Sequence, residues 1–179
     1  RVLFRSTKTI DKPIDRFIIL VKGKDKAGDF YRATFYGLFP YVSNRVPEIA
    51  DDIYKVDDAM CAGFGWELGP FETWDAVGLE KSIPQMEAAG YRPNQWVYDM
   101  IASGNKSFYK VESGQKKYYD IASKTYKSIP GGEAFIVMRN FENQTVWKNS
   151  ACRTYHIGDD VLGLEWYTKM GSIGGEVLE

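Results

Sequence analysis

The hydrophobic pattern of this chain changes its period near Gly104, and that change limits the possible folds more than any other feature. Before Gly104, apolar residues recur every two to four positions, which is typical of buried helices; after it, apolar and polar residues alternate, which is typical of half-buried strands. Helices followed by strands predict an α+β fold. With 179 residues, 44% of them hydrophobic and 26% charged, the chain is long enough to bury a core.

The part before Gly104 is expected to consist of a linker over residues 1–27 and a helical domain over residues 28–104. The first helix is predicted to begin with Asp29 as its N-cap, and Pro40 is expected to kink it or end it early. Glycines and capping residues then predict helices from Asp57 or the turn before it to a left-handed cap at Gly63, from Pro70 to Gly78, from Leu79 to Gly90, and from Asn94 to Gly104.

The part after Gly104 is predicted to hold short strands joined by tight turns. Residues 105–133 are expected to form a connector of β-hairpins, with strands at 108–111, 117–121 and 125–129 and a turn at 112–115. Residues 134–179 are expected to form a separate part, with strands at 135–138, 145–147, 153–157 and 161–166, a turn at 158–160, and a short helix at the end.

Composition excludes several classes of function. The formal net charge of -1, without a basic stripe, argues against nucleic-acid binding. The longest apolar run, residues 17–21, is too short to span a bilayer, so we expect no membrane partner and a cytoplasmic location. Cys61 and Cys152 have no metal-ligand spacing and His156 is the only histidine, so no metal site is expected and both thiols are expected to be free.

Polar clusters offer candidate chemistry, although a structural role is the favoured interpretation of each. His156 lies in a predicted strand and is expected to face solvent or a local partner. Glu72 and Asp75 could form an acid and base pair together with Glu67, but carboxylates in a first turn also complement the helix dipole. A run of acids suggests a hard cation or, more simply, helix capping and a solvated face: Glu48, Asp51, Asp52, Asp57 and Asp58.

Aromatic residues recur at helical spacing in the first predicted helix. They could line an acyl or adenine pocket, but aromatic residues in this pattern more often form a core or a helix interface. The set is Phe30, Tyr31, Phe35, Tyr36, Phe39 and Tyr41. Because the chain also has no glycine-rich dinucleotide or phosphate loop and no nucleophile elbow, no catalytic or cofactor-binding residue is expected in it.

Three segments, residues 45–52, 56–60 and 63–78, carry the order D-x-A-M, G, G-P-F-E, D-x-x-G. This pattern resembles the C-terminal helical domain of 3-hydroxyacyl-CoA dehydrogenases, over roughly residues 28–104, in the form of the second copy found in long fused dehydrogenases. Its structural signature is Gly63, Trp66, Gly69, Pro70, Phe71, Trp74, Asp75 and Gly78. Because the tryptophans and Phe71 fall at helix ends, we expect them to fix a helix crossing by packing.

Residues 157–175 are similar to the opening strands of an enoyl-CoA hydratase of the crotonase superfamily. In that family the comparable segment runs beside bound CoA. The resemblance therefore implies weak CoA contacts for Lys169 and Met170 in the full-length parent. Gly171 stands where an asparagine is common in the family, which departs from the pattern.

Together the two resemblances imply an internal fragment of a fused 3-hydroxyacyl-CoA dehydrogenase and enoyl-CoA hydratase. The family's NAD-binding domain and its catalytic His and Glu lie upstream, so the fragment is expected to hold no cofactor and to be inactive alone, while the parent uses NAD. Its expected partners are the rest of the parent polypeptide, acyl-CoA substrates of that parent, and a second copy in a homodimer. The alternative is a stand-alone dimerisation or acyl-CoA-binding module.

Overall fold

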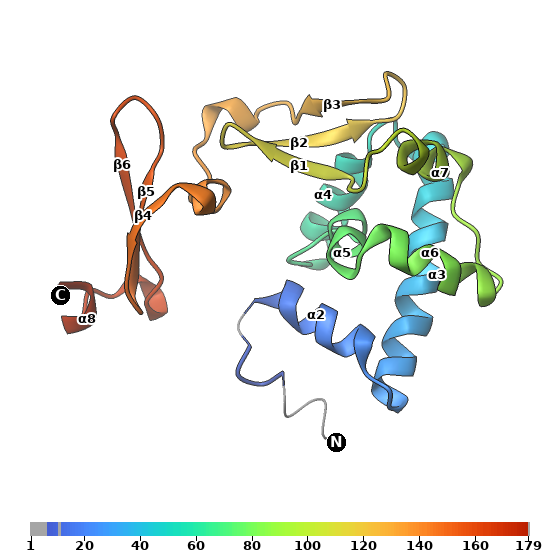
Figure 1. The fold of residues 1–179 in the computed structure, drawn as a ribbon, viewed down its shortest axis with the longest axis horizontal. Coiled ribbons are helices and arrows are strands. Elements are labelled where there is room, and N and C mark those ends of the chain that lie inside the picture. Colours follow the sequence, from blue (N-terminus) through green and yellow to red (C-terminus); the bar gives the residue numbers. More distant parts are fainter. Residues whose placement is uncertain (1–6, 11, 179) are drawn as a thin grey trace. The chain divides into compact units, whose positions relative to one another are not determined.

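The computed structural model describes residues 7–10 and 12–178, except for the side chains of Pro13, Glu133 and Lys169. Within this range the longer helices precede the strands (Figure 1), so the predicted α+β class is confirmed. The helices are α2 (Pro13–Lys22), α3 (Lys26–Ile49), α4 (Ile53–Phe64), α5 (Pro70–Val77), α6 (Leu79–Ala88), α7 (Gln95–Ala102) and α8 (Gly175–Leu178). The strands are β1 (Tyr109–Glu112), β2 (Gln115–Asp120), β3 (Thr125–Ser128), β4 (Thr145–Lys148), β5 (Cys152–His156) and β6 (Leu162–Trp166).

Two compact units make up the chain, and their boundary differs from the predicted one. The first unit contains the described residues up to Lys110 together with Tyr118–Lys127; the second contains Val111–Lys117 and the residues from Ser128 onward. Most of the expected connector, residues 105–133, therefore belongs to the helical unit rather than between two domains. The change of period at Gly104 marks a change of secondary structure and not the end of a domain.

Helix α3 begins earlier than predicted and continues past Pro40. Asp25, not Asp29, is its N-cap, and the Asp25 side chain accepts a hydrogen bond from the Gly28 backbone N–H at 3.0 Å. The helix continues through Pro40 and Pro47, so the expectation that Pro40 ends it is wrong. A proline costs about 3 kcal/mol in a helix interior, and burial of one apolar face along α3 is large enough to offset that cost.

Helix α4 also differs from its predicted limits. It begins at Ile53, in the turn before Asp57, which was one of the two expected starts. Its left-handed C-cap is Gly65 (φ 66°) instead of Gly63, which lies inside the helix. The predicted ends of α5 are confirmed, since Pro70 is its first residue and Gly78 (φ 100°) is its C-cap. Helices α6 and α7 form as predicted, and the Asn94 side chain caps α7 by accepting from the Trp96 N–H.

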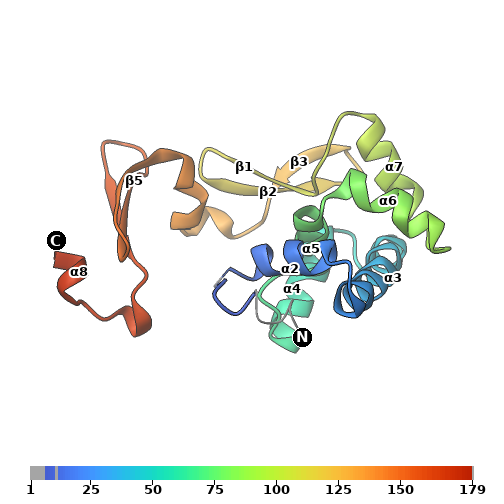
Figure 2. The same cartoon turned by 60° about the horizontal axis from the view of Figure 1, so that its bottom comes forward.

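The segment expected as a linker contains α2, which packs against α3 and α5. Leu20 and Val21 of this helix are buried, which gives the segment a place in the core. Residues 1–6 and Asp11 of the predicted linker lie outside the described residues. Helix α5 occupies the middle of the helical unit and contacts α2, α3, α4 and α6 (Figure 2).

An aromatic column forms the core of the helical unit. The Phe39 and Trp74 rings stack with centroids 5.1 Å apart and an interplanar angle of 3°, and Phe108 lies 5.1 Å from Trp74 on another side. All three side chains are fully buried. Among the aromatic residues of α3, Phe35, Tyr36 and Phe39 are buried as expected, while Phe30 and Tyr41 are exposed. The prediction of a core role is thus confirmed for half of that set.

Strands β1, β2 and β3 form one three-stranded sheet in that order. Ser113 and Gly114 join β1 to β2, and their positive φ angles of 51° and 73° are those of a tight type I′ hairpin turn. In the first unit, the Tyr118 hydroxyl donates to Asp52 at 2.9 Å, and its ring lies 4.7 Å from the Tyr54 ring. These contacts attach β2 to the first turn of α4.

The second unit is built on the sheet β4-β5-β6, in which neighbouring strands are antiparallel. The predicted turn at 158–160 is confirmed, and Asp159 and Asp160 both have positive φ. The predicted strand at 135–138 is wrong, because residues 135–137 have no regular structure and Met138 begins a 3-10 helix that ends at Gln144. Phe135, Ile136 and Val137 are exposed, and β-propensity without a pairing strand does not make a sheet.

Among the described residues, no helix is long and apolar enough to cross a membrane.

Candidate functional site

Asp57, the first residue of the D-x-A-M segment, contacts the signature at the start of α5 and is a deeply buried acidic side chain, with 3% of its surface exposed. It extends from α4 to the N-terminus of α5, where it accepts the Phe71 N–H at 2.9 Å and the Glu72 N–H at 3.1 Å. The Tyr109 hydroxyl donates to it from β1 at 2.8 Å. One carboxyl group therefore connects α4, α5 and β1.

Gly69 makes this arrangement possible. A Cβ at position 69 would lie 2.2 Å from the Cβ and Cγ atoms of Asp57, so only glycine lets the chain pass the Asp57 side chain. The Gly69 N–H donates to the Glu72 carboxylate at 2.9 Å, as in a capping box. The amide donors at the start of α5 are thus occupied by two carboxyl groups of the protein itself.

Asp75 performs the corresponding task at the other end of α5. It accepts the Phe108 N–H at 2.8 Å and the Tyr109 N–H at 3.0 Å, which holds the start of β1 against the helix. The sequence predicted Asp75 as part of the signature but did not indicate its acceptor role. The contacts of Phe108 and Tyr109 with Asp57 and Asp75 were not predicted, because a polar partner distant along the chain leaves no periodic signal.

Burial raises the pKa of Asp57 from 3.8 to about 7, opposed by hydrogen bonds from Phe71, Tyr109 and Glu72 that favour the charged form. The nearby Glu72 carboxylate raises the pKa of Asp57 further. Burial likewise raises the pKa of Tyr109 well above its ordinary value, and the adjacent Asp57 adds to that effect. A tyrosine of this kind stays protonated and continues to donate to Asp57.

The acid and base pair that the sequence suggested, Glu72 and Asp75 together with Glu67, does not form a reaction site. Glu72 accepts the Gly69 N–H, Asp75 accepts the β1 amides, and Glu67 lies in an exposed loop. In the acidic run, Asp52 accepts from Tyr118 and pairs with Lys55 at 2.9 Å. Among the residues that the structure describes, no group of three or more potential ligands could hold a metal ion.

The two tryptophans of the signature have different environments. Trp74 is fully buried and its indole N–H donates to the Ser82 hydroxyl at 2.8 Å, which connects α5 to α6. Phe71 is also fully buried, with its ring 5.0 Å from that of Phe108. Trp66 lies in the loop between α4 and α5 and is 36% exposed, so the expectation that it packs at the crossing is wrong. The Gly65 cap ends α4 before Trp66 and leaves it outside the core.

The remaining predicted positions lie in the second unit. Met170 is 95% exposed, and its backbone has a positive φ of 60° within a 3-10 helix over Lys169–Gly171. The Lys169 side chain lies outside the described part of the chain. His156 is the last residue of β5 and is exposed, with its Nε2 4.0 Å from an Asp160 carboxylate oxygen. Cys152 is buried, and among the described residues neither Cys152 nor Cys61 forms a disulfide.

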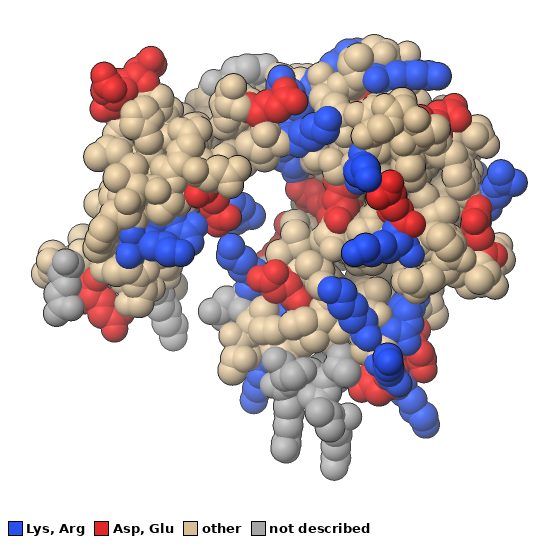
Figure 3. Space-filling model, in the orientation of Figure 1, with Lys and Arg blue, Asp and Glu red and all other residues tan. Residues whose placement is uncertain are grey.

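Charged side chains of both signs are interspersed on the face of the helical unit that Figure 3 shows, without a single-sign patch. A shallow apolar cavity of about 350 Å³ lies between α6 and α7, lined by Ile83, Pro84, Tyr98 and Ile101 among others. Its polar groups already have partners, since Glu80 pairs with Lys106 at 3.5 Å and the Tyr98 hydroxyl donates to Glu87 at 2.7 Å. The geometry of the signature is therefore that of a structural junction.

The geometry of this junction does not show which proteins the chain is related to, but comparison with known proteins does. The chain is 35% identical over 162 residues to a "Probable 3-hydroxyacyl-CoA dehydrogenase" of Bacillus subtilis, which covers 89% of this chain and 20% of that protein. It is 28% identical over 117 residues to a "Putative fatty acid oxidation complex trifunctional enzyme" of Rickettsia felis, covering 61% of this chain and 15% of that protein. No family model and no solved structure matches.

The chain thus spans a fifth or less of the length of these relatives. The region of identity with the Bacillus protein covers most of the chain, including parts of both units. The homology supports the dehydrogenase resemblance at this coarser level, whereas the hydratase resemblance of residues 157–175 stays a prediction. The chain is homologous to one segment of a 3-hydroxyacyl-CoA dehydrogenase and of a fatty acid oxidation enzyme.

Proposed function

We propose that this chain is a noncatalytic segment of a 3-hydroxyacyl-CoA dehydrogenase of fatty-acid β-oxidation. In this proposal the helical unit supports the dehydrogenase fold and the second unit links it to an enoyl-CoA hydratase domain. The observation that carries the proposal is the 35% identity to the Bacillus subtilis protein over 89% of the chain. The parent would oxidise 3-hydroxyacyl-CoA with NAD as hydride acceptor and would be a cytoplasmic enzyme.

The noncatalytic role follows from how the acidic side chains are used. Asp57, Glu72 and Asp75 each accept backbone N–H groups, and Asp57 is buried, which supports a structural role for them. The amides at the start of α5 are occupied by Asp57 and are not available to a pyrophosphate, which supports an NAD site elsewhere in the parent. NAD would therefore be held by another part of the parent.

The linking role is supported by the surface of the second unit. One face of the sheet β4-β5-β6 carries exposed apolar side chains from β4 and β6, namely Trp147, Leu162, Leu164 and Trp166. Contiguous apolar surface of this kind typically marks an interface. We propose that the remainder of the parent polypeptide covers it, with Lys169 and Met170 beside the CoA of an acyl-CoA substrate.

An enzyme assay tests the proposal directly. The purified chain is expected to give no reduction of acetoacetyl-CoA by NADH above the rate of a protein-free blank. The longer polypeptide that contains it is expected to be active in the same assay. Robust turnover by the chain alone would overturn the noncatalytic assignment, and an inactive longer polypeptide would overturn the dehydrogenase assignment.

The same apolar face also fits a second candidate, a stand-alone module that dimerises or binds acyl-CoA. Calorimetry with CoA and acyl-CoA, combined with the mass in solution, separates the two candidates. Tight binding of acyl-CoA by a dimer would favour the module. A chain without acyl-CoA affinity would favour the segment of a larger enzyme.

A further inference from the structure

A cavity of about 500 Å³ lies on the second unit, where β4 and β5 meet the 3-10 helix over Met138–Gln144. Its volume is in the range of small-molecule sites. Its lining combines two cations, one carboxylate, a hydroxyl group and two apolar side chains: Lys148, Arg153, Glu142, Thr145, Val146 and Trp147. None of these residues belongs to the signature or to the proposed CoA contacts.

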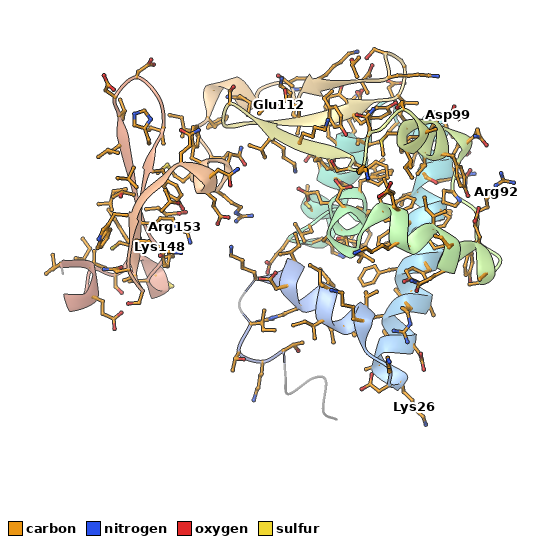
Figure 4. All side chains as sticks on the ribbon, viewed as in Figure 1. Lys26, Arg92, Asp99, Glu112, Lys148 and Arg153 are labelled. Carbon is orange, nitrogen blue, oxygen red and sulfur yellow. The ribbon has the colours of Figure 1, made fainter. Side chains whose placement is uncertain are left out.

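The two cations lie directly opposite each other. Lys148 of β4 and Arg153 of β5 are register partners in the antiparallel pair, so their side chains project from the same face of the sheet. Figure 4 labels both residues at neighbouring positions on these strands. Like charges directly opposite each other destabilise a sheet, and an anion placed between them offsets that repulsion.

The hydrogen bonds of Arg153 leave part of its guanidinium unused. Its Nη1 donates to the Glu142 carboxylate at 2.9 Å, which holds the side chain in place. Its Nε is buried and has no acceptor among the described residues. An arginine offers five N–H donors in a rigid fork, and the Nε and Nη2 edge of that fork matches two oxygens of one oxyanion.

Lys148 differs from Arg153 in having no acidic partner among the residues that the structure describes. The neighbouring acid on β6, Glu165, is opposite Arg153 and accepts from the Tyr155 hydroxyl. The cavity lining itself, with two cations and Glu142, carries a formal charge of +1. An ammonium at the mouth of such a cavity is available to a ligand.

We propose that this cavity binds an organic phosphate, with the phosphate group between Lys148 and Arg153. A phosphate monoester carries a charge of about -1.5 to -2 at pH 7 and three acceptor oxygens, which matches two opposed cations better than a carboxylate does. Val146, which is 61% exposed, belongs to the cavity lining and provides an apolar contact for the body of the ligand. Glu142 acts as a positioning residue, because it fixes Arg153 through the opposite edge of the guanidinium.

The experiment is a titration of the full chain with phenyl phosphate, followed by amide chemical shifts in nitrogen–proton correlation spectra. Saturable shifts are expected in residues 142–153, with weaker binding of benzoate and of inorganic phosphate. Lys148→Gln is expected to weaken phenyl phosphate binding about tenfold, since it removes one charge-assisted contact. Lys148 is exposed, so the spectrum of this variant is expected to remain that of a folded protein.

Lys116→Gln is the matched control, because it removes the same charge from the same unit outside the cavity. It is expected to leave the affinity unchanged. An equal loss in both variants would mean general charge attraction and would overturn the proposal. The absence of saturable shifts in residues 142–153 would overturn it as well, and benzoate binding as tight as phenyl phosphate would overturn the choice of phosphate.

Discussion

At the scale of single residues, the helical unit depends on carboxyl groups that serve backbone amides of other elements. Asp57 accepts from α5 and β1, and Asp75 accepts from β1. Each such hydrogen bond contributes roughly 0.5–3 kcal/mol, and the upper part of this range applies when the carboxyl group is charged. Asp57 nevertheless bears a desolvation cost, because only 3% of its surface reaches solvent.

That cost makes the stability of the protein depend on pH. Burial raises the pKa of Asp57 from 3.8 to about 7 in the folded state. The contribution of Asp57 to stability is therefore complete below the unfolded pKa and is lost as the pH rises from about 4 through about 7. A shift of about three units corresponds to at most about 4 kcal/mol. In Asp57→Asn this pH-dependent loss is expected to disappear, although the variant loses one acceptor and is less stable at pH 4.

Urea unfolding curves measured from pH 4 to pH 8 give the comparison. Asp51→Asn is the control, since the Asp51 side chain is 97% exposed and its replacement is expected to keep the slope of the parent chain. If the curves of Asp57→Asn and the parent chain ran parallel across this range, Asp57 would have an ordinary pKa.

At the scale of elements, the C-cap of α4 sets the point where the chain leaves the helix and enters the loop to α5. Gly65 has a φ of 66°, which an L-residue adopts at a cost of roughly 1–2 kcal/mol, whereas Gly63 has helical geometry. The sequence pattern predicted Gly63 as the cap. No local signal separates Gly63 from Gly65, because glycine at either position can adopt a positive φ.

Two alanine substitutions test this assignment. Gly65→Ala is expected to lower the free energy of unfolding by about 1 kcal/mol or more. Gly63→Ala is expected to raise it by up to about 1 kcal/mol, because alanine is the better helix former and a Cβ there meets nothing within 4 Å. Thermal unfolding of both variants is the measurement, and a reversed order of stability would restore Gly63 as the cap.

Other elements show which signals a single sequence carries. Proline at the first position and glycine at the end located α5 correctly, because both residues act through their own backbone. Pro40 misled the prediction, since tertiary burial along α3 outweighs a local preference. Residues 135–138 misled it as well, because a strand requires a partner that the segment itself does not specify.

At the scale of the whole molecule, the helical unit is not complete at the last helix. Phe108 is fully buried against Phe71 and Trp74, and its N–H donates to Asp75. Tyr118 and Tyr119 of β2 are also buried. The sequence located these strands correctly, but the contacts that join them to the helices are distant along the chain and leave no local pattern.

Truncation at two places tests this organisation. A protein ending at Gly104 is expected to lose its cooperative thermal transition, because it exposes Phe71 and Trp74 and leaves Asp75 without the two β1 amide donors. A protein ending at Ser128, the last residue of β3, is expected to keep a cooperative transition. Equal behaviour of the two proteins in calorimetry would contradict the assignment of the β-strands to the helical unit.

The contact between Gly69 and Asp57 also has an evolutionary consequence. A side chain at position 69 would occupy the volume that the Asp57 side chain fills. A larger residue at position 69 is therefore tolerated only after position 57 has changed, and substitutions at the two positions are expected to be correlated. Their separation along the chain is fixed for the same reason, since an insertion in the intervening loop that displaced Gly69 would move Asp57 off the Phe71 and Glu72 amides. Homologues are therefore expected to keep or to change positions 57 and 69 together.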